Sequence, residues 1–205
     1  MQYDGGMLDH VTSDTSDASP DGVGDPIREA HCGVLEMAIA NRPLEETLTA
    51  LIDIVESTSK TGVLGSILLL DEGGQHLRHG AAPSLPSAYN EAVHGIEIGP
   101  MQGSCGTAAF TGHPVFVTDI ENDPKWASFA DLALMYGLRA CWSTPILTAG
   151  RKVLGTFAMY HREPREPTVR DLALVDLVTQ TAALVIDRNR AETALREIGA
   201  IAARA

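Results

Sequence analysis

Hydrophobic residues recur at helical spacing near both ends of the chain and at strand-like spacing in the middle. An apolar face begins at Ile27 and ends at the break formed by Asn41, Arg42 and Pro43. A second stripe recurs at intervals of mostly three and four residues, in Leu44, Leu48, Leu51, Ile52 and Val55. This period predicts two amphipathic helices that each turn one face to a core.

Short apolar runs separated by turn residues predict a sheet in the middle of the chain. Residues 65–70 and 75–81 flank a turn that ends in Gly73 and Gly74, which predicts a β-hairpin. Further strand segments are expected at 96–98, 113–118, 138–147 and 152–161. Short helices are expected at 85–94, after the glycine-rich turn that starts at Gly103, and at 126–136. Pro114 places the strand at 113–118 near an edge of the sheet.

A long helix is predicted from Thr168 onward. Thr168 and Asp171 resemble a capping box, and apolar positions follow them. Two sets of residues farther along are spaced by seven: Leu184, Ala191 and Ile198, and Arg188, Leu195 and Ala202. This weak heptad pattern fits either the start of a parallel dimer stalk or a solvated helix end. The order of elements predicts an α+β fold, with terminal helices on one sheet face and short helices and loops on the other.

Composition divides the 205 residues into three regions. Residues 1–25 carry six Asp and no Lys or Arg, which predicts a disordered acidic tail. Residues 26–190 are expected to form the globular domain, and residues 191–205 a helical extension that fits the start of a coiled coil. The tail contributes half of the net charge of −12, so the mildly acidic body is not expected to bind nucleic acid.

The sequence also limits the compartment and the cofactor chemistry. No apolar run reaches the length of a membrane span, and the N-terminus lacks a signal-peptide pattern. We therefore expect a cytoplasmic chain without a membrane partner. The three cysteines, Cys32, Cys105 and Cys141, lack metal-ligand spacing and predict reduced thiols. The seven histidines are scattered, and the sequence requires no cofactor and no metal.

An ordered set of motifs runs through the centre of the chain. Residues 103–110 read Gly-Ser-Cys-Gly-Thr-Ala-Ala-Phe, and Pro114-Val115 and Asp119-Ile120 follow. The set continues through residues 123–126, 137–146 and 154–167. The order and spacing of these motifs resemble a GAF domain over about residues 28–190. The resemblance is to GAF domains found beside PAS domains in bacterial sensor kinases and diguanylate cyclases.

This resemblance implies a fold and a class of function. It implies a central antiparallel sheet of five or six strands, with a ligand cavity on the face opposite the terminal helices. Members of the family bind cyclic nucleotides, bilins, haem, amino acids or nitrate-like anions there, and others have no known ligand. The resemblance thus implies a sensory domain of bacterial signal transduction that binds an unidentified small molecule. It also implies a homodimer formed through the terminal helices, and a kinase or cyclase output domain or partner, as in two-component systems.

The candidate ligand-binding residues lie in and after the glycine-rich segment. Aromatic residues make up 5% of the chain, and one short stretch holds Trp126, Phe129, Tyr136 and Trp142. An aromatic wall with a few polar groups is typical of a small-molecule pocket, although the same rings also fit an ordinary core. The polar candidates that could orient a ligand are Thr107, Asp119, Arg139 and Ser143. An arginine would suit a carboxylate or phosphate.

Cys105 is the remaining candidate, and it raises the enzymatic alternative. A glycine-rich helix entrance suits an anion and lowers the pKa of a thiol, although we favour the interpretation of Cys105 as a small buried residue in a tight turn. Free methionine-R-sulfoxide reductase, itself a GAF domain, has a similar Cys-Gly-Thr-Ala-Ala segment. Its second cysteine precedes the fourth strand, where residues 126–137 contain none, while Cys141 falls within a strand. We therefore assign no catalytic residue, and a purely structural dimerisation module is the third hypothesis.

Overall fold

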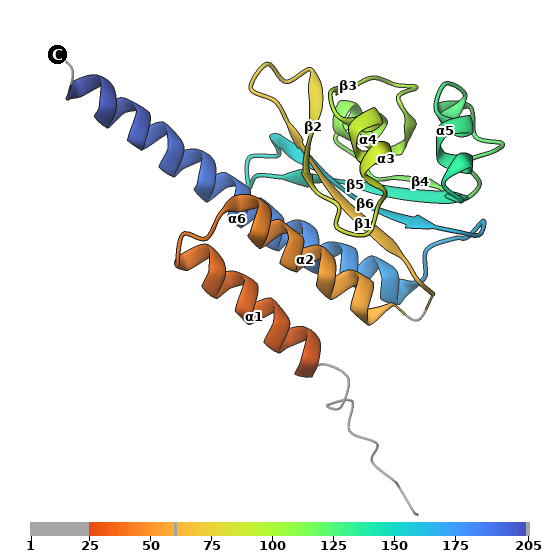
Figure 1. Ribbon diagram of the computed structural model, residues 1–205, viewed down its shortest axis with the longest axis horizontal. Coiled ribbons are helices and arrows are strands. Elements are labelled where there is room, and N and C mark those ends of the chain that lie inside the picture. Colours follow the sequence, from red (N-terminus) through yellow and green to blue (C-terminus); the bar gives the residue numbers. More distant parts are fainter. Residues whose placement is uncertain (1–24, 60, 204–205) are drawn as a thin grey trace, which may run out of the picture.

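An antiparallel sheet of six strands separates two helical layers (Figure 1). The computed structural model describes residues 25–59 and 61–203, so the predicted acidic tail lies outside the described residues except for Asp25. The strands are β1 (Leu64–Leu70), β2 (His76–Ala81), β3 (Ile96–Glu97), β4 (Val115–Val117), β5 (Ala140–Leu147) and β6 (Val153–His161). They are ordered β3-β2-β1-β6-β5-β4, which confirms the predicted edge position of the strand after Pro114.

The terminal helices form the layer on one face of the sheet. Helices α2 (Leu44–Thr58) and α6 (Val169–Ala202) pack on the strands, and α1 (Asp25–Ile39) packs mainly against α2 (Figure 1). The boundary between α1 and α2 falls at Pro43, as the sequence predicts. Glu45 and Glu46 lie in the first turn of α2. Their negative charges stabilise the helix because its N-terminus is the positive end of the helix dipole.

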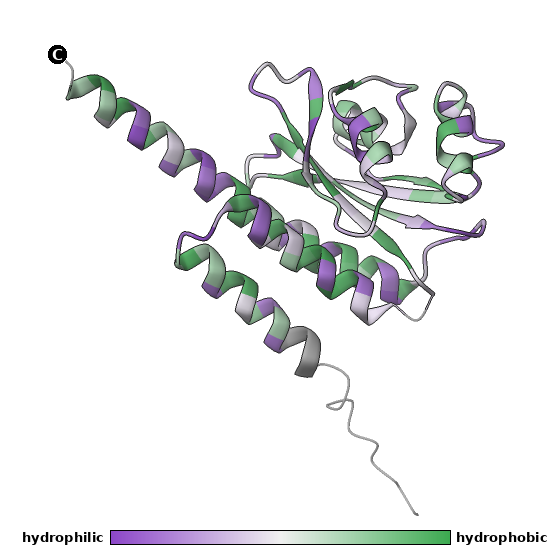
Figure 2. Cartoon of the chain, viewed as in Figure 1, coloured by the Kyte–Doolittle hydropathy of each residue, from purple (hydrophilic) through white to green (hydrophobic). Residues whose placement is uncertain are grey.

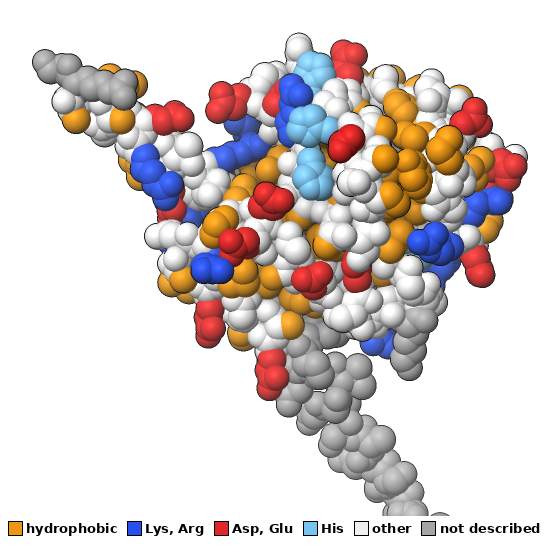
Figure 3. All heavy atoms as spheres, in the orientation of Figure 1, with side chains coloured by type: hydrophobic (Ala, Val, Ile, Leu, Met, Phe, Trp, Pro, Cys, Tyr) orange, Lys and Arg blue, Asp and Glu red, His pale blue; other side chains and the backbone are white. Residues whose placement is uncertain are grey.

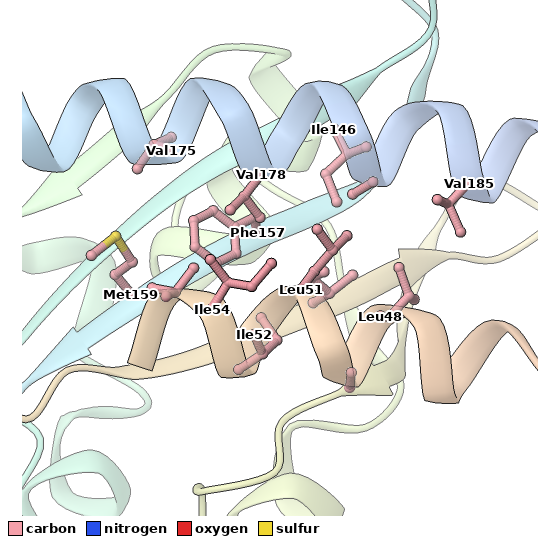
Figure 4. Packing of buried hydrophobic residues seen from close by; sticks show 14 of the residues in the cluster. Leu48, Leu51, Ile52, Ile54, Ile146, Phe157, Met159, Val175, Val178 and Val185 are labelled. Carbon is pink, nitrogen blue, oxygen red and sulfur yellow. The ribbon is translucent and has the colours of Figure 1, made fainter. Parts of the chain in front are cut away.

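The core between this layer and the sheet is built from the predicted apolar stripe. Figure 4 shows side chains of α2 and α6 meeting over the strands: Leu48, Leu51, Ile52, Ile54, Val175, Val178 and Val185 lie over Ile146, Phe157 and Met159. Leu51, Ile52 and Phe157 are at most 1% exposed. Burial of a side chain of this size contributes about 1.5–3 kcal/mol, so this contact fixes the helices to the sheet.

Helix α6 begins at the predicted capping box and extends beyond the sheet. The Thr168 side chain accepts a hydrogen bond from the Asp171 backbone N–H at 3.3 Å, and the Asp171 carboxylate accepts one from the Thr168 N–H at 2.9 Å. The helix is 34 residues long, and its second half projects away from the strands (Figure 1). Hydrophobic residues recur there among polar ones (Figure 2). Within the described residues, no helix has the length and apolar character needed to cross a membrane.

Four short helices and their loops cover the other face of the sheet. They are α3 (Ser87–Val93), α4 (Gly103–Thr111), η2 (Pro124–Trp126) and α5 (Ala130–Met135). The single helix predicted at 126–136 is wrong, because Phe129 leaves the helical conformation with φ −127° and ψ −8° and separates η2 from α5. The glycine-rich segment is helical from Gly103, whose φ of +60° suits glycine.

The side chains of the central strands are divided between the two faces of the sheet by the alternation of a β-strand. On β6, Phe157 and Met159 belong to the helix-side core, while Ala158 and Tyr160 belong to the core on the other face. β1 and β6 are packed tightly at Gly155, where a Cβ atom would overlap the backbone carbonyl of Leu68. The predicted α+β architecture, with its division of helices between the two sheet faces, is confirmed.

Candidate functional site

Polar contacts fix α4 to the centre of the sheet. The hydroxyl of Ser104 donates a hydrogen bond to the carbonyl oxygen of Cys141 at 2.9 Å. The same hydroxyl accepts one from the indole N–H of Trp126 at 3.0 Å. All three residues are buried. Ser104 therefore joins α4, β5 and η2, and it holds the next residue, Cys105, against the strands.

The thiol of Cys105 lies among buried aromatic rings. Its Sγ is 3.9 Å from the phenol oxygen of Tyr160, which is the cross-strand partner of Cys141. Tyr89 stands edge-on to Tyr160 and to Tyr136, with ring centroids 5.9 and 5.8 Å apart. Burial raises the pKa of Tyr89 and Tyr160 well above the ordinary value, so both phenols stay protonated and can donate hydrogen bonds.

The two buried thiols influence each other directly. Hydrogen bonding from the Cys141 thiol, with smaller contributions from the hydroxyls of Ser143, Tyr160 and Thr156, lowers the pKa of Cys105 to about 7 against the opposing effect of burial. Burial raises the pKa of Cys141 well above its ordinary value, and its neighbour Cys105 raises it further. The surroundings of the pair therefore favour ionisation of Cys105 over that of Cys141.

Three buried hydroxyls on the same sheet face have no hydrogen-bond partner among the described residues. They belong to Ser66 of β1, Ser143 of β5 and Thr156 of β6, which are 3%, 0% and 0% exposed. Ser66 and Ser143 lie on either side of Ala158 in the register of the sheet. An unpaired buried hydroxyl lowers the stability of the fold by about 1–3 kcal/mol. Hydroxyl groups without partners in the described part of the chain thus lie next to the two thiols.

A small cavity lies between the sheet and the layer that contains Cys105. Its volume is about 20 Å³, and its wall includes Leu68, Tyr89, Val93, Phe129, Leu132 and Tyr160. That space holds one or two water molecules. The metabolite-sized hollow that the sequence led us to expect is thus largely filled by the rings themselves. A larger groove of about 340 Å³ lies on the helical side, between the end of α2 and the start of α6.

Comparison with known proteins identifies this arrangement. The sequence pattern of the GAF domain matches residues 41–187. This chain belongs to the GAF domain family. The resemblance drawn from the ordered motifs is confirmed, and the small helices over the sheet are those of a GAF domain.

One relative of this GAF domain is the methyl sulfide methyltransferase-associated sensor of Methanosarcina acetivorans. The two are 37% identical over 164 residues, which make up 80% of this chain and 16% of the relative. The chain therefore spans about a sixth of the length of that protein.

Two solved structures share the fold of this GAF domain. The GAF domain of the phosphoenolpyruvate-protein phosphotransferase from Coxiella burnetii has a TM-score of 0.64 and 18% identity, covering 82% of this chain and 96% of its own. Free methionine-R-sulfoxide reductase from Neisseria meningitidis has a TM-score of 0.63 and 14% identity, covering 85% and 96%. At these identities the likeness extends to the fold alone.

The GAF fold brings five of the nine predicted ligand residues together. Cys105, Trp126 and Phe129 line the cavity. Tyr136 packs against the cavity residue Tyr89, as described above. Ser143 lies close enough to lower the pKa of Cys105. These five share one layer, and ligand binding by them stays a prediction.

Three of the polar candidates have local partners instead. Thr107 is buried, and its hydroxyl accepts a hydrogen bond from the backbone N–H of Gln102 at 3.3 Å, at the first turn of α4. Arg139 forms ion pairs with Glu121 at 2.8 Å and with Asp119 at 3.8 Å, all of them partly exposed. The arginine and Asp119 thus neutralise each other at the surface, and neither lines the cavity.

Trp142 lies on the opposite face of the sheet, under the helical layer. Its indole N–H donates to the carbonyl oxygen of Arg165 at 3.0 Å, and its ring lies 4.1 Å from the ring of His161. Burial, and then the positive charge of Arg165, lower the pKa of His161 to about 4, against an opposing effect of Asp171. The neutral histidine therefore packs on the indole as an apolar ring, close to the start of α6.

The sequence did not indicate several residues that complete the site. Tyr89 and Tyr160 supply the rings around Cys105, and Ser66 and Thr156 supply unpaired hydroxyls. The alternation along 153–161 predicts that residues 156, 158 and 160 share a face, but the register that brings Ser66 and Cys141 beside them is visible only in the folded sheet. No group of three His, Cys, Asp or Glu side chains in the described residues is placed to hold a metal.

The position of Cys141 and the size of the cavity bear on the alternative that this domain is a methionine sulfoxide reductase. Cys141 lies beside Cys105 although it does not occupy the second-cysteine position of the reductases. A cavity of about 20 Å³ has no room for methionine sulfoxide unless the surrounding rings move. The fold is shared with reductases, so catalysis is left as an alternative to a signalling role.

Proposed function

We propose that this chain is the sensory or regulatory GAF domain of a signalling protein, and that it passes a change around Cys105 to α6. Membership of the GAF family and the 37% identity to a protein named as a sensor support a signalling role. The output would lie on a kinase or cyclase domain, or on a separate partner protein. A small ligand or reactive molecule at the cavity would supply the stimulus.

Two adjacent residues of β5 support a connection between the two faces of the sheet. Cys141 faces the cavity layer, and the next residue, Trp142, faces the helices. The Trp142 indole is bonded to Arg165, whose guanidinium pairs with Asp171 of the α6 capping box at 3.1 Å. A change in the position of β5 would therefore act on the residues that fix the start of α6.

The single observation that carries the proposal is the division of α6 into two parts. Its first half is anchored on the sheet by buried Val175, Val178 and Ile186. Its second half presents apolar side chains to solvent: Leu195, Ile198 and Ile201 are 69%, 64% and 71% exposed. The first part of α6 is fixed to the sheet, and its second part carries exposed apolar side chains. Such a helix is suited to pairing with the same helix of a second copy.

A stimulus can shift such a dimer only by binding or reacting better with one of its states. The proposal therefore requires two arrangements of α6 that differ in energy by a few kcal/mol. Twofold pairing of α6 would make both protomers change together and would enlarge the effect on an attached output domain.

Charges placed in the proposed seam should separate the protomers. We expect the double variant Leu195→Glu/Ile198→Glu to raise the dimer dissociation constant about 100-fold or more, because four carboxylates would be buried in the paired helices. Light scattering across a concentration series measures this change directly.

The matched control is Thr193→Glu/Ala200→Glu, which adds the same charge on the opposite side of the same helical turns. This control should remain dimeric, and circular dichroism should give the same helix content for both variants. A seam variant that dimerises like the native chain, or a native chain that is monomeric at all concentrations, would overturn the proposal.

A further inference from the structure

Two buried cysteines lie together in the layer that covers the cavity side of the sheet. Two thiols lie in one buried cluster, held in place by the bond from Ser104 to the Cys141 carbonyl and by the contact between Cys105 Sγ and the Tyr160 hydroxyl. The third cysteine, Cys32, lies far away on α1 and is exposed. The pair is thus separate from the only other thiol of the chain.

The unpaired hydroxyls indicate which form of Cys105 the site favours. The hydroxyls of Ser143 and Thr156 have no hydrogen-bond partner among the described residues, and both contribute to lowering the pKa of Cys105. A thiolate would accept their hydrogen bonds and remove the cost of leaving them unsatisfied. Donors are therefore available beside Cys105 for a negative charge on its sulfur, and the thiolate is the reactive form of cysteine.

The size of the cavity restricts the reactant. A space of about 20 Å³ beside Cys105 admits a molecule the size of one or two waters. Its lining is mainly apolar, which disfavours a charged reactant. Hydrophobic side chains also reach the surface over this layer (Figure 3). Met101 and Met135 are among the exposed hydrophobic residues. Hydrogen peroxide is small, uncharged and able to donate and accept hydrogen bonds, so it fits these limits.

We propose that Cys105 and Cys141 form a peroxide-reactive pair that closes to a disulfide. The Cys105 thiolate attacks one peroxide oxygen, the S–O bond forms, the O–O bond breaks, and hydroxide leaves and takes up a proton. The Cys141 sulfur then attacks the Cys105 sulfur, so that the S–S bond forms, the S–O bond breaks, and a second water leaves with the Cys141 proton. Two thiols and one peroxide become one disulfide and two waters.

This reaction deepens the proposed function, because it names the stimulus that acts at the cavity layer. The chemical step itself needs neither dimerisation nor an output domain. The oxidation chemistry and the signalling role can therefore fail separately in experiment.

The test uses the full chain in a Cys32→Ser background, treated with hydrogen peroxide, denatured, alkylated and weighed by mass spectrometry. We expect the folded chain to lose both alkylatable thiols together. The Cys141→Ser variant should stop at a sulfenic acid that dimedone traps on Cys105, and Cys105→Ser should leave Cys141 unreacted at the same dose. The monomeric seam variant Leu195→Glu/Ile198→Glu should oxidise at the native rate.

The pH profile keeps the proposal testable if a cysteine variant fails to fold. The oxidation rate of the folded Cys32→Ser chain should rise with pH through a midpoint near 7, because the thiolate fraction of Cys105 rises there. Ser143→Ala should move this midpoint upward and slow the reaction at pH 7 about fivefold, if it removes about one pKa unit of thiolate stabilisation. Two alkylatable thiols that survive peroxide, or equal oxidation of Cys141 without Cys105, would overturn the proposal.

Discussion

Replacing Gly155 by alanine should destabilise the domain by about 3 kcal/mol or more, which is among the largest effects expected of one added methyl group. A Cβ atom at this position would overlap the backbone carbonyl of Leu68 on the neighbouring strand. Backbone cannot move aside as a flexible side chain can. β1 and β6 would have to separate where Gly155 pairs with Leu69 on one side and Ile146 on the other.

Urea denaturation followed by circular dichroism measures this change. The matched control is Gly33→Ala on α1, where an added Cβ meets nothing within 4 Å. Alanine in a helix is favoured over glycine by about 0.5–1 kcal/mol, so the control should gain stability. Equal stability of Gly155→Ala and the native chain would show that the two strands are not as close as described.

Replacing Trp142 by alanine should cost about 3–5 kcal/mol, because a nearly buried indole is lost from the core. The loss also leaves the Arg165 carbonyl without its donor and removes the ring that packs on His161. Both partners lie next to the capping box of α6. We therefore expect the first turns of α6 to become less protected as well, which hydrogen exchange can measure alongside urea denaturation.

Two control variants separate packing from hydrogen bonding. Trp142→Phe keeps a ring but not the donor, and it should lose only part of this stability. Trp126→Phe removes the bond from the indole to Ser104 on the other face, so it should loosen α4 and leave the start of α6 protected. The account of Trp142 fails if its alanine variant loses less than about 1 kcal/mol, the value of a single hydrogen bond.

The fold was predictable from local pattern to a large extent. The stripe in residues 44–55, the hairpin turn and the capping box at Thr168 each depend on neighbouring residues, and each was found where expected. The helix predicted at 126–136 failed because Pro124 and the Asp123 side chain favour a short 3₁₀ turn that ends before Phe129. Local competition between turn types is not visible in an apolar pattern.

The site was less predictable because it depends on contacts across the sheet. The sequence groups Trp142 with Trp126 because both are aromatic and lie close together along the chain. The alternation of side chains along β5 instead places Trp142 on the face covered by the terminal helices. By residue type, Arg139 and Asp119 are suited to orienting a ligand. In the structure the guanidinium of Arg139 instead forms ion pairs with Asp119 and Glu121. The relation between Cys105 and Cys141 comes from the packing of α4 on β5, which no spacing in the sequence encodes.

Hydrogen exchange of residues 169–178 is the most direct test of whether the cavity layer acts on α6. The Cys32→Ser chain would be compared before and after peroxide, with disulfide formation verified by mass in the same samples. The account predicts that exchange at the start of α6 changes about fivefold or more on oxidation, and that Cys105→Ser abolishes this change. A disulfide that forms fully while exchange in α6 stays the same would contradict it.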